Sequence, residues 1–229
     1  MPSYVFPPAP IPAAPIRGRD ALFPIHRIFR VGRNYEAHAK EMGAVVDREA
    51  PFYFNKSAHA YVASGSTVPY PPGTKDYHHE MELVVAIGKA GLRIAEASAL
   101  DHVFGYACGL DMTRRDLQRA MGDQKKPWEI GKSFDRSAPI GPLHTVAQTG
   151  HFTKGAIWLR VNGQLKQNAN LNQMIWSVAE QVSKLSDAFE LFPGDIIYSG
   201  TPENVGPVVR GNVMEGRIDG LYDIRVRVV

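Results

Sequence analysis

The feature that most constrains the fold is a short acidic segment that runs directly into an apolar strand. Residues 80–82 read Glu-Met-Glu, and the apolar run Leu83–Ile87 follows. Side chains alternate between faces along a strand, so Glu80 and Glu82 point one way and Met81 points the other. A carboxylate pair about 7 Å apart along a strand is costly beside a buried sheet unless a cation compensates it. We therefore expect Glu80 and Glu82 to be two ligands of a divalent metal.

The composition is that of an ordinary globular chain of 229 residues, with 44% hydrophobic and 21% charged residues. This length allows one large domain with a substantial core. No apolar run reaches the roughly eighteen residues of a membrane span, and we see no secretory signal pattern. The single cysteine, Cys108, excludes an intramolecular disulfide and favours a cytoplasmic location. The net charge of +3 gives weak support for an anionic small-molecule substrate and almost none for nucleic acid.

Prolines dominate the N-terminal segment. Residues 1–24 contain seven of them, which excludes a helix and predicts an extended arm that lies on the surface or on a partner subunit. A partly disordered tail fits the same composition. No later shift in composition marks a boundary, so we expect a proline-rich arm over residues 1–24 and a single catalytic domain over residues 25–229.

Strand patterns outnumber helix patterns along the chain. We expect about ten short strands and three or four helices. These elements do not alternate in a βαβ rhythm, so the expected fold is α+β and predominantly β, a sandwich or rolled sheet. Asn162-Gly163 predicts the turn of a hairpin. The expected strands include 25–31, 51–56, 104–110, 127–134, 157–161, 196–198 and 222–228, and the expected helices are 35–42, 95–100, 113–121 and 171–185.

A third acidic position, Asp111, stands at the end of an apolar strand. Thr113 and Asp116 have the spacing of a capping box, which predicts the start of a helix. Backbone N–H groups and side chains gather at such strand-to-helix junctions, and ligand sites are common there. Arg115 and Gln118 share one face of this helix and could bind a carboxylate or keto group beside the metal. Arg115 could equally pair with Asp111 or Asp116.

Three carboxylates around one point repel one another strongly. At about 4 Å and an effective dielectric near 20, each pair costs about 4 kcal/mol, so Glu80, Glu82 and Asp111 together require a cation or protonation. All-oxygen ligands favour Mg²⁺, Mn²⁺ or Ca²⁺, with positions left for water or substrate. His78 and His79 adjoin the pair and make Zn²⁺ or Fe²⁺ conceivable. We expect both histidines to be neighbours of the site rather than ligands.

Two further segments carry candidate polar groups. His38 and Glu41 are three residues apart on one face of a short predicted helix. A carboxylate beside a histidine orients the ring for general-base catalysis, although the same spacing is typical of a weak surface ion pair. Near the C-terminus, the small-residue loop 199–202 contains Gly200 and Thr201 and could offer N–H and hydroxyl donors to an anion.

Several sequence blocks stand in a fixed order and cover most of the chain from residue 25 onward. They are Val31–Tyr35 with His38 and Glu41, His78–Leu83, Leu110–Gln118, Lys132–Asp135, and Gly194–Asp195 with Gly200–Pro202. Their combination, which is far more specific than any one block, resembles the fumarylacetoacetate hydrolase family.

Four segments resemble most closely the bacterial members of the gentisate pathway within that family. They are Phe23–Pro24, His38–Gly43, Thr113–Gln118 and Met174–Ser177. Arg30 departs from the pattern, because related enzymes often have a small or sulfur-containing residue there.

The resemblance implies a mixed β-sandwich roll, a homodimer, and a metal held by Glu80, Glu82 and Asp111. The implied metal is Mg²⁺ or Mn²⁺, with Ca²⁺ as a further candidate. The implied reaction is hydrolysis of a carbon–carbon bond in an acylpyruvate, a small anionic 2,4-dioxo acid. The likeness to gentisate-pathway members points to 3-fumarylpyruvate, with fumarate and pyruvate as products. The implied catalytic residues are His38, Glu41 and Lys132, and the implied substrate-binding residues are Arg115, Gln118, Lys132, Gly200 and Thr201.

Two alternatives stay open. A decarboxylase that acts on oxaloacetate, or an isomerase of the same family, would use the same metal and a similar pocket. The His38–Glu41 pair favours activation of water, and hence hydrolysis. A non-catalytic metal-binding structural protein would keep the three carboxylates but would not need His38, Glu41 and Lys132 together. If the chain is an enzyme, residues 35–46 are expected to form a lid over the site.

Overall fold

The structure is a computed structural model that describes residues 3–43 and 48–229. Within these residues, eighteen strands form four sheets, and six short α-helices join them. Many of the strands have only two or three residues. Sequence patterns detect the longer runs, which is why they predict fewer strands. The α+β, predominantly β fold with mixed and rolled sheets is confirmed. None of the described helices is both long and apolar enough to cross a membrane.

The largest sheet has eight strands and carries the acidic segment. Strand β8 (Met81–Ile87) is buried along its whole length and lies between β15 (Ile196–Tyr198) and β9 (Val103–Leu110). β8 is antiparallel to both neighbours, whereas β15 is parallel to β3 (Ile28–Gly32), so the sheet is mixed. Its other strands are β4 (Phe52–Lys56), β11 (Ala138–Ile140), β5 (Tyr61–Ala63) and β12 (His144–Thr145).

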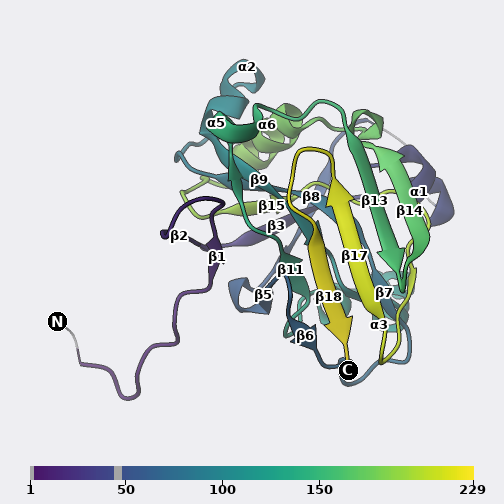
Figure 1. The fold of residues 1–229 in the computed structure, drawn as a ribbon. Coiled ribbons are helices and arrows are strands. Elements are labelled where there is room, and N and C mark those ends of the chain that lie inside the picture. The colour runs from purple at the N-terminus through teal and green to yellow at the C-terminus, as the bar shows by residue number, and fades with distance from the viewer. Residues whose placement is uncertain (1–2, 44–47) are drawn as a thin grey trace.

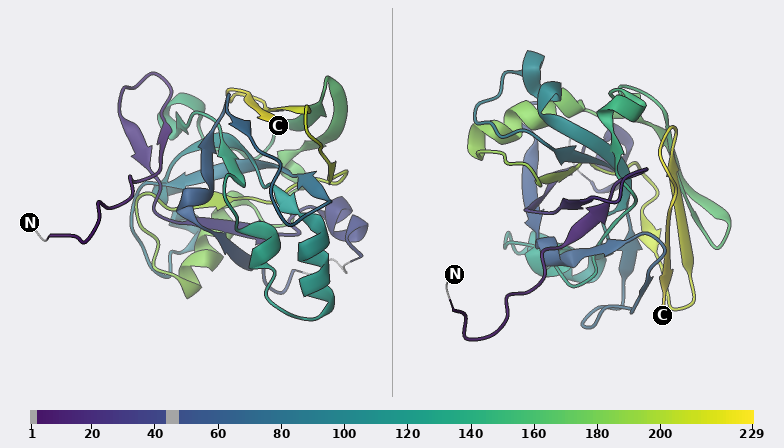
Figure 2. Two further views of the ribbon diagram at one scale, coloured as in Figure 1. Left: turned by 90° about the horizontal axis from the view of Figure 1, so that it is seen from below. Right: turned by 60° about the vertical axis from the view of Figure 1, so that its left-hand side comes forward.

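A second sheet of five strands packs against the first. Figure 1 shows its long strands side by side in front of β8 and β9, and Figure 2 (right) shows the sheet close to edge-on. The predicted hairpin is present, because Asn162 and Gly163 have φ angles of 50° and 78° and join two of its strands. The sheet consists of β14 (Gln164–Asn170), β13 (Ala156–Val161), β17 (Val213–Ile218), β18 (Ile224–Val228) and β6 (Thr67–Val68).

The alternation of side chains along β8 divides the core into two clusters. Met81, Leu83, Val85 and Ile87 belong to the main cluster between the two large sheets. Val84 and Ala86, on the opposite face, belong to a second cluster. Alternation places Glu82 on the face of Val84, away from the main core. The acidic pair and Met81 therefore lie on opposite faces, as the sequence predicts.

Two small sheets complete the structure. Strand β7 (Tyr77–His79) pairs with β10 (Thr113–Arg114) and β16 (Gly206–Pro207), which brings three distant chain segments together beside the acidic pair. At the N-terminus, β1 (Ala13–Pro15) and β2 (Leu22–Pro24) form a hairpin whose Ala14 and Phe23 are buried in the second cluster. The preceding described residues extend away from the body (Figure 1).

The helices are short and lie in the connections between strands. The α-helices are α1 (Glu36–Glu41), α2 (Glu96–Ala99), α3 (Arg115–Asp123), α4 (Glu129–Lys132), α5 (Val146–Thr149) and α6 (Val178–Ala188), and the 3₁₀ turns are η1 (Ala58–Ala60), η2 (Leu100–His102) and η3 (Leu171–Gln173).

The helix predicted over 171–185 is wrong in its first part. The Ile175 N–H donates to the Asn34 carbonyl at 2.8 Å, which keeps the chain extended before α6. α6 then begins after Ser177, whose side chain forms a capping box with Glu180. Tertiary contacts thus override the apolar period ahead of this cap.

The strand predicted over 127–134 is also wrong, because Lys132 ends helix α4. α4 packs tightly on α3, since a Cβ on Gly131 would lie only 2.6 Å from the Gln118 nitrogen. The predicted capping box at Thr113 is likewise absent, and α3 begins at Arg115. Thr113 instead pairs with His78 in a two-stranded ladder.

Candidate active site

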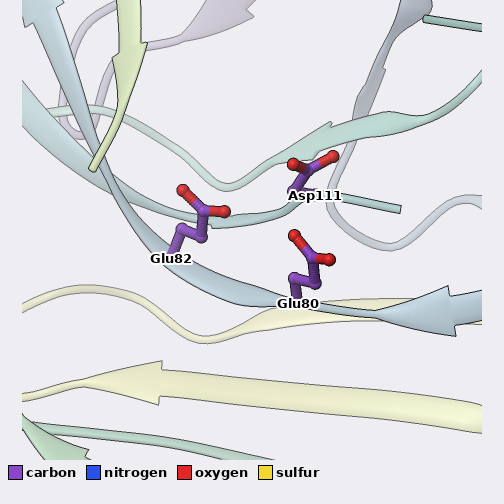
Figure 3. A group of neighbouring side chains, drawn as sticks. All are labelled: Glu80, Glu82 and Asp111. Carbon is purple, nitrogen blue, oxygen red and sulfur yellow. The ribbon is translucent and has the colours of Figure 1, made fainter. Parts of the chain in front are cut away.

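Three carboxylates converge at the start of β8 (Figure 3). Glu82 is the second residue of this strand, Glu80 directly precedes it, and Asp111 directly follows β9. The antiparallel register places Met81 opposite Leu110, and the Asp111 N–H donates to the Glu80 carbonyl at 2.8 Å. All three side chains are buried, and each offers an oxygen within 4.8 Å of the others. The structure therefore brings the three predicted ligands together.

Lys132 and Arg115 neutralise Glu80. The Lys132 Nζ lies 2.7 Å from Glu80 Oε2 and 2.9 Å from Asp111 Oδ2, and the Arg115 guanidinium pairs with the other Glu80 oxygen. Burial alone would raise the pKa of Glu80, but Lys132 and Arg115 hold this pKa well below its ordinary value. Arg115 also donates to Gln118 Oε1 at 3.1 Å, which leaves the Gln118 NH₂ group as a donor toward a ligand.

Two further basic side chains approach Asp111, and no pattern in the sequence predicts them. The Arg30 guanidinium is fully buried, lies 2.5 Å from Asp111 Oδ2, and stacks 3.8 Å from the ring centre of Tyr198. The Lys56 Nζ lies 2.8 Å from Asp111 Oδ1. Burial lowers the pKa of Lys56 well below its ordinary value, although Asp111 opposes this effect.

Glu82 has less positive charge around it than its two neighbours. Arg30 Nη1 is 3.7 Å away, and the Gly200 N–H donates to Glu82 Oε2 at 2.7 Å. Burial raises the pKa of Glu82 to about 8, and Asp111 and Glu80 add to this effect. Three carboxylate oxygens in one buried shell, one of them short of positive charge, fit a hard divalent cation.

Gly200, which was expected to bind substrate, thus directs its backbone N–H at a carboxylate. Its φ angle is +97°, and a Cβ there would lie 2.5 Å from the Asn34 Cβ. Only glycine meets both requirements without strain. The next residue of this loop, Thr201, lines the cavity beside the carboxylates.

His38 and Glu41 form the predicted pair on α1. The His38 Nδ1 lies 3.0 Å from Glu41 Oε2, and the other Glu41 oxygen accepts the Asn204 N–H at 3.1 Å. Burial alone would raise the pKa of Glu41, but the His38 contact and the Asn204 N–H hold it below its ordinary value. His38 is buried, whereas Glu41 is exposed, so the pair joins a buried ring to a carboxylate at the surface. Residues 44–46 of the expected lid lie outside the described residues.

The carboxylates and His38 line one cavity. One wall is aromatic, with the Trp128 ring 5.7 Å from Phe52 and 6.0 Å from Phe54. The cavity therefore has an acidic, cation-rich end and an apolar end. Its lining residues are Val31, Gly32, Arg33, His38, Met42, Phe52, Phe54, Glu80, Glu82, Asp111, Arg115, Gln118, Trp128, Lys132 and Thr201.

The two histidines beside the acidic pair bond to other groups. His78 Nε2 lies 2.7 Å from Asp76 Oδ1, and His79 Nδ1 lies 3.2 Å from Gln167 Oε1. Burial lowers the pKa of His79 to about 4, so this ring is neutral at physiological pH. Both positions agree with the expectation that these residues are neighbours rather than ligands.

The fold and the site define a class of protein: a mixed β-roll with three buried carboxylates that could bind a metal ion and, on the same cavity, a histidine whose ring contacts Glu41. Residues 27–229 match the family model described as "Fumarylacetoacetate (FAA) hydrolase C-terminal". The chain therefore belongs to the fumarylacetoacetate hydrolase family.

Individual relatives in this family carry more specific names. A fumarylpyruvate hydrolase of a Ralstonia species is 48% identical over 192 residues, which cover 82% of this chain and 98% of the relative. The crystal structure of fumarylpyruvate hydrolase from Pseudomonas aeruginosa in complex with Mn²⁺ and pyruvate has a TM-score of 0.97 and 53% identity, with 99% of both chains covered. The mitochondrial oxaloacetate tautomerase of Mus musculus is 40% identical over 86% of this chain and 89% of the relative.

Proposed function

We propose that the chain is a metal-dependent hydrolase that cleaves the carbon–carbon bond of an acylpyruvate, with 3-fumarylpyruvate as its substrate. The observation that carries the proposal is the single cavity that His38 shares with the three carboxylates, since it places a general base beside a metal site. The 48% and 53% identities to proteins named fumarylpyruvate hydrolase support the fumaryl group.

The charges of the site suit a doubly charged anion. Arg30, Lys56, Arg115 and Lys132 lie against the three carboxylates and compensate their negative charge. A bound divalent cation would therefore make the site net positive. Fumarylpyruvate carries two carboxylates, so this charge attracts it and compensates its burial.

Glu80, Glu82 and Asp111 would hold the metal, and we propose Mg²⁺, which Mn²⁺ can replace. When bound, the cation supplies Lewis-acid stabilisation of the charge that develops on the 2-oxo acid. Around it, Arg115, Gln118, Lys132 and Thr201 would bind the carboxylate and keto oxygens of the pyruvyl end.

The His38–Glu41 pair performs the proton transfer. Glu41 orients the ring through Nδ1, and the other ring nitrogen takes a proton from water. The hydroxide adds to the 4-carbonyl carbon, and Lys132 stabilises the oxyanion. The bond between C3 and C4 then breaks, and its electron pair stays with the pyruvyl fragment as an enolate. This enolate accepts at C3 the proton that His38 took from water, which returns His38 to its neutral form, and the products are fumarate and pyruvate.

The apolar end of the cavity supports a flat acyl tail. Phe52, Phe54 and Trp128 would contact the conjugated fumaryl chain, and the Arg33 guanidinium lies 5.6 Å from the Phe52 ring centre. Arg33 also lines this cavity, and we propose that it pairs with the distal carboxylate of the substrate.

An oxaloacetate tautomerase or decarboxylase is the second candidate, because relatives with these names are 40% identical. Oxaloacetate would use the same pyruvyl contacts but would leave the aromatic end of the cavity without a ligand. The substrate of the hydrolase would also occupy the aromatic end of the cavity, and its hydrolysis would use the His38–Glu41 pair.

We also propose a homodimer in the cytoplasm. Tyr4, Val5, Phe6 and Ile11 are exposed apolar side chains on the extended N-terminal segment, which a second copy of the chain could cover. The buried single cysteine, Cys108, is compatible with a reducing compartment.

A panel of 2-oxo acids tests the function directly. Fumarylpyruvate, acetylpyruvate and oxaloacetate are each mixed with the enzyme and Mg²⁺ or Mn²⁺, and the loss of absorbance is followed together with the products. We expect fumarylpyruvate to give equimolar fumarate and pyruvate, with no reaction in excess chelator. Turnover of oxaloacetate alone would establish the second candidate. If the enzyme turned over none of these compounds, the result would favour a metal-binding structural protein.

The matched control is His38→Ala. This variant should lose at least about 100-fold in kcat and should still bind pyruvate in the presence of Mn²⁺. Loss of both properties together would make His38 structural.

A further inference from the structure

Gln167 is a fully buried polar residue on β14 that the reaction above does not use. It belongs to the five-stranded sheet, yet its side chain reaches the edge of the active site. Its Nε2 group donates to Thr201 Oγ1 at 2.9 Å, to the Pro202 carbonyl at 2.9 Å and to the Glu203 carbonyl at 3.2 Å. Gln167 therefore holds the loop that follows β15.

The same side chain also holds the acidic strand. Its Oε1 atom accepts the backbone N–H of Met81 at 3.0 Å. A backbone N–H can only donate and a backbone carbonyl can only accept, so these contacts fix which end of the amide is oxygen. His79 Nδ1 lies 3.2 Å from the same oxygen, and the neutral ring must carry its proton on Nδ1 to bond there.

This orientation determines what Thr201 can do. The Thr201 Oγ1 atom accepts a hydrogen bond from Gln167 Nε2, so the Thr201 hydroxyl must donate its own hydrogen bond elsewhere. Within residues 3–43 and 48–229, no group accepts that proton, and Thr201 lines the cavity beside Glu80 and Glu82. The free direction of the hydroxyl is therefore toward a ligand in the cavity.

We propose that Gln167 is a positioning residue, which orients the Thr201 hydroxyl as a donor to the carboxylate or keto oxygen of the bound 2-oxo acid. By joining Met81 to the loop 201–203, it also fixes the distance between the acidic strand and that donor. The inference rests on the proposed function for the identity of the ligand. The hydrogen bonds from Gln167 to the loop 201–203 do not depend on any ligand.

A double-mutant cycle measures whether Gln167 acts through Thr201. Gln167→Leu, Thr201→Val and the double variant are titrated with pyruvate in the presence of Mn²⁺ by calorimetry. Loss of a hydrogen bond to a charged ligand should weaken binding about tenfold in each single variant. The double variant should bind within about twofold of the single variants, because both substitutions remove one donor. If the double variant bound pyruvate about 100-fold more weakly than the wild type, the two residues would act independently and the proposal would be overturned.

Steady-state kinetics separates positioning from general damage. Gln167→Leu should raise KM for the acylpyruvate about tenfold and leave kcat within about threefold, because His38, Glu41 and Lys132 are untouched. Gln167→Glu should bind pyruvate as weakly, since its carboxylate accepts the Met81 N–H but turns the Thr201 hydroxyl toward itself. Gln164→Leu is the control, because Gln164 is exposed on the same strand. A fall in kcat with KM unchanged, or normal pyruvate binding by Gln167→Glu, would contradict the assignment.

Hydrogen exchange of the ligand-free protein keeps the two proposals apart. Gln167→Leu should increase exchange in the peptide that covers residues 199–204 at least about tenfold, whereas Gln164→Leu should not. If the wild-type chain does not bind pyruvate, the proposed function fails while the loop result still stands. If exchange of the loop is unchanged, the role of Gln167 is overturned whatever the enzyme binds.

Discussion

At the scale of single residues, we expect Arg33 to distinguish a charged acyl tail from a neutral one. It lines the cavity beside the aromatic wall, where the distal carboxylate of fumarylpyruvate would lie. Arg33→Met should therefore raise KM for fumarylpyruvate about tenfold, because a hydrogen bond between charged groups is lost. KM for acetylpyruvate, whose tail is neutral, should change less than about twofold.

The control for this prediction is Arg136→Met. Arg136 is another arginine in the left-handed region, with φ 57° against 56° for Arg33, and it does not line the cavity. It should leave both KM values unchanged. If Arg33→Met raised KM equally for fumarylpyruvate and acetylpyruvate, Arg33 would not bind the distal carboxylate of the acyl tail.

Arg30 raises a separate question, because it is a cation buried beneath a metal site. Replacement by Met leaves Lys56 and Lys132 beside Asp111, so we expect the lower end of the cost of breaking a buried ion pair, about 3 kcal/mol. A divalent cation restores the missing positive charge. Denaturant unfolding of Arg30→Met should therefore show a large loss of stability in chelator and a smaller one with Mn²⁺.

An exposed pair provides the comparison for Arg30. Arg225 lies 3.2 Å from Glu215 on the surface, and Arg225→Met should cost less than about 1 kcal/mol with or without metal. If the loss in Arg30→Met were the same in chelator and in Mn²⁺, the guanidinium and the metal would not compensate the same carboxylates.

Arg30 also shows where prediction from sequence ends. The grouping of Glu80, Glu82 and Asp111 follows from alternation, strand ends and charge repulsion, all of which are local. Arg30 alternates with the core residues Phe29 and Val31, which suggests an outward position. It faces the carboxylates only because β15 and β8 follow β3 in the sheet, and no local pattern encodes that order. The resemblance marks the residue as unusual without placing it.

At the scale of elements, the close approach of β9 and β12 requires glycine. A Cβ on Gly105 would lie 2.1 Å from the His144 carbonyl oxygen, and backbone cannot move away as a flexible side chain can. Gly105→Ala should therefore destabilise the protein by about 3 kcal/mol. Because Asp111 directly follows β9, the affinity for Mn²⁺ should fall as well, and calorimetry and denaturant unfolding measure the two effects.

Gly122→Ala is the matched substitution on a helix. Gly122 lies in α3, and a Cβ there would make an ordinary contact of 3.7 Å with Trp128. Alanine favours the helix over glycine, so this variant should be more stable by about 0.5–1 kcal/mol. Similar losses in both variants would mean that the spacing of β9 and β12 is not what makes Gly105 necessary.

Helices and strands could be predicted where a local sequence pattern, and not packing against distant residues, defines them. The hairpin at Asn162-Gly163 and the buried strand β8 depend on turn chemistry and alternation, and both are present. The start of α6 was also readable, because Ser177 and Glu180 form a capping box that the apolar period concealed. α4 was not readable, since its four residues are held by packing on α3 rather than by any helical pattern.

At the scale of the whole molecule, the N-terminal segment divides into two parts with different expected roles. Residues 13–24 form a hairpin that donates and accepts backbone hydrogen bonds with Leu143 and buries Phe23 against Phe104. The residues before Pro10 that the structure describes are exposed. The first part of the arm should therefore matter for association between copies, and the hairpin should matter for folding.

Two truncations test this division. Removal of residues 1–9 should leave the free energy of unfolding at low protein concentration within about 0.5 kcal/mol of the full chain and should weaken the proposed dimer at least about tenfold, because Tyr4, Val5 and Phe6 are lost. Removal of residues 1–24 should cost a further 3–5 kcal/mol, about the effect of deleting a buried Phe. Sedimentation across a concentration series gives the dimer affinity, and denaturant unfolding gives the stability. A dimer unaffected by the short truncation would place the contact between copies elsewhere, and a stable long truncation would show that the second core cluster does not need the hairpin.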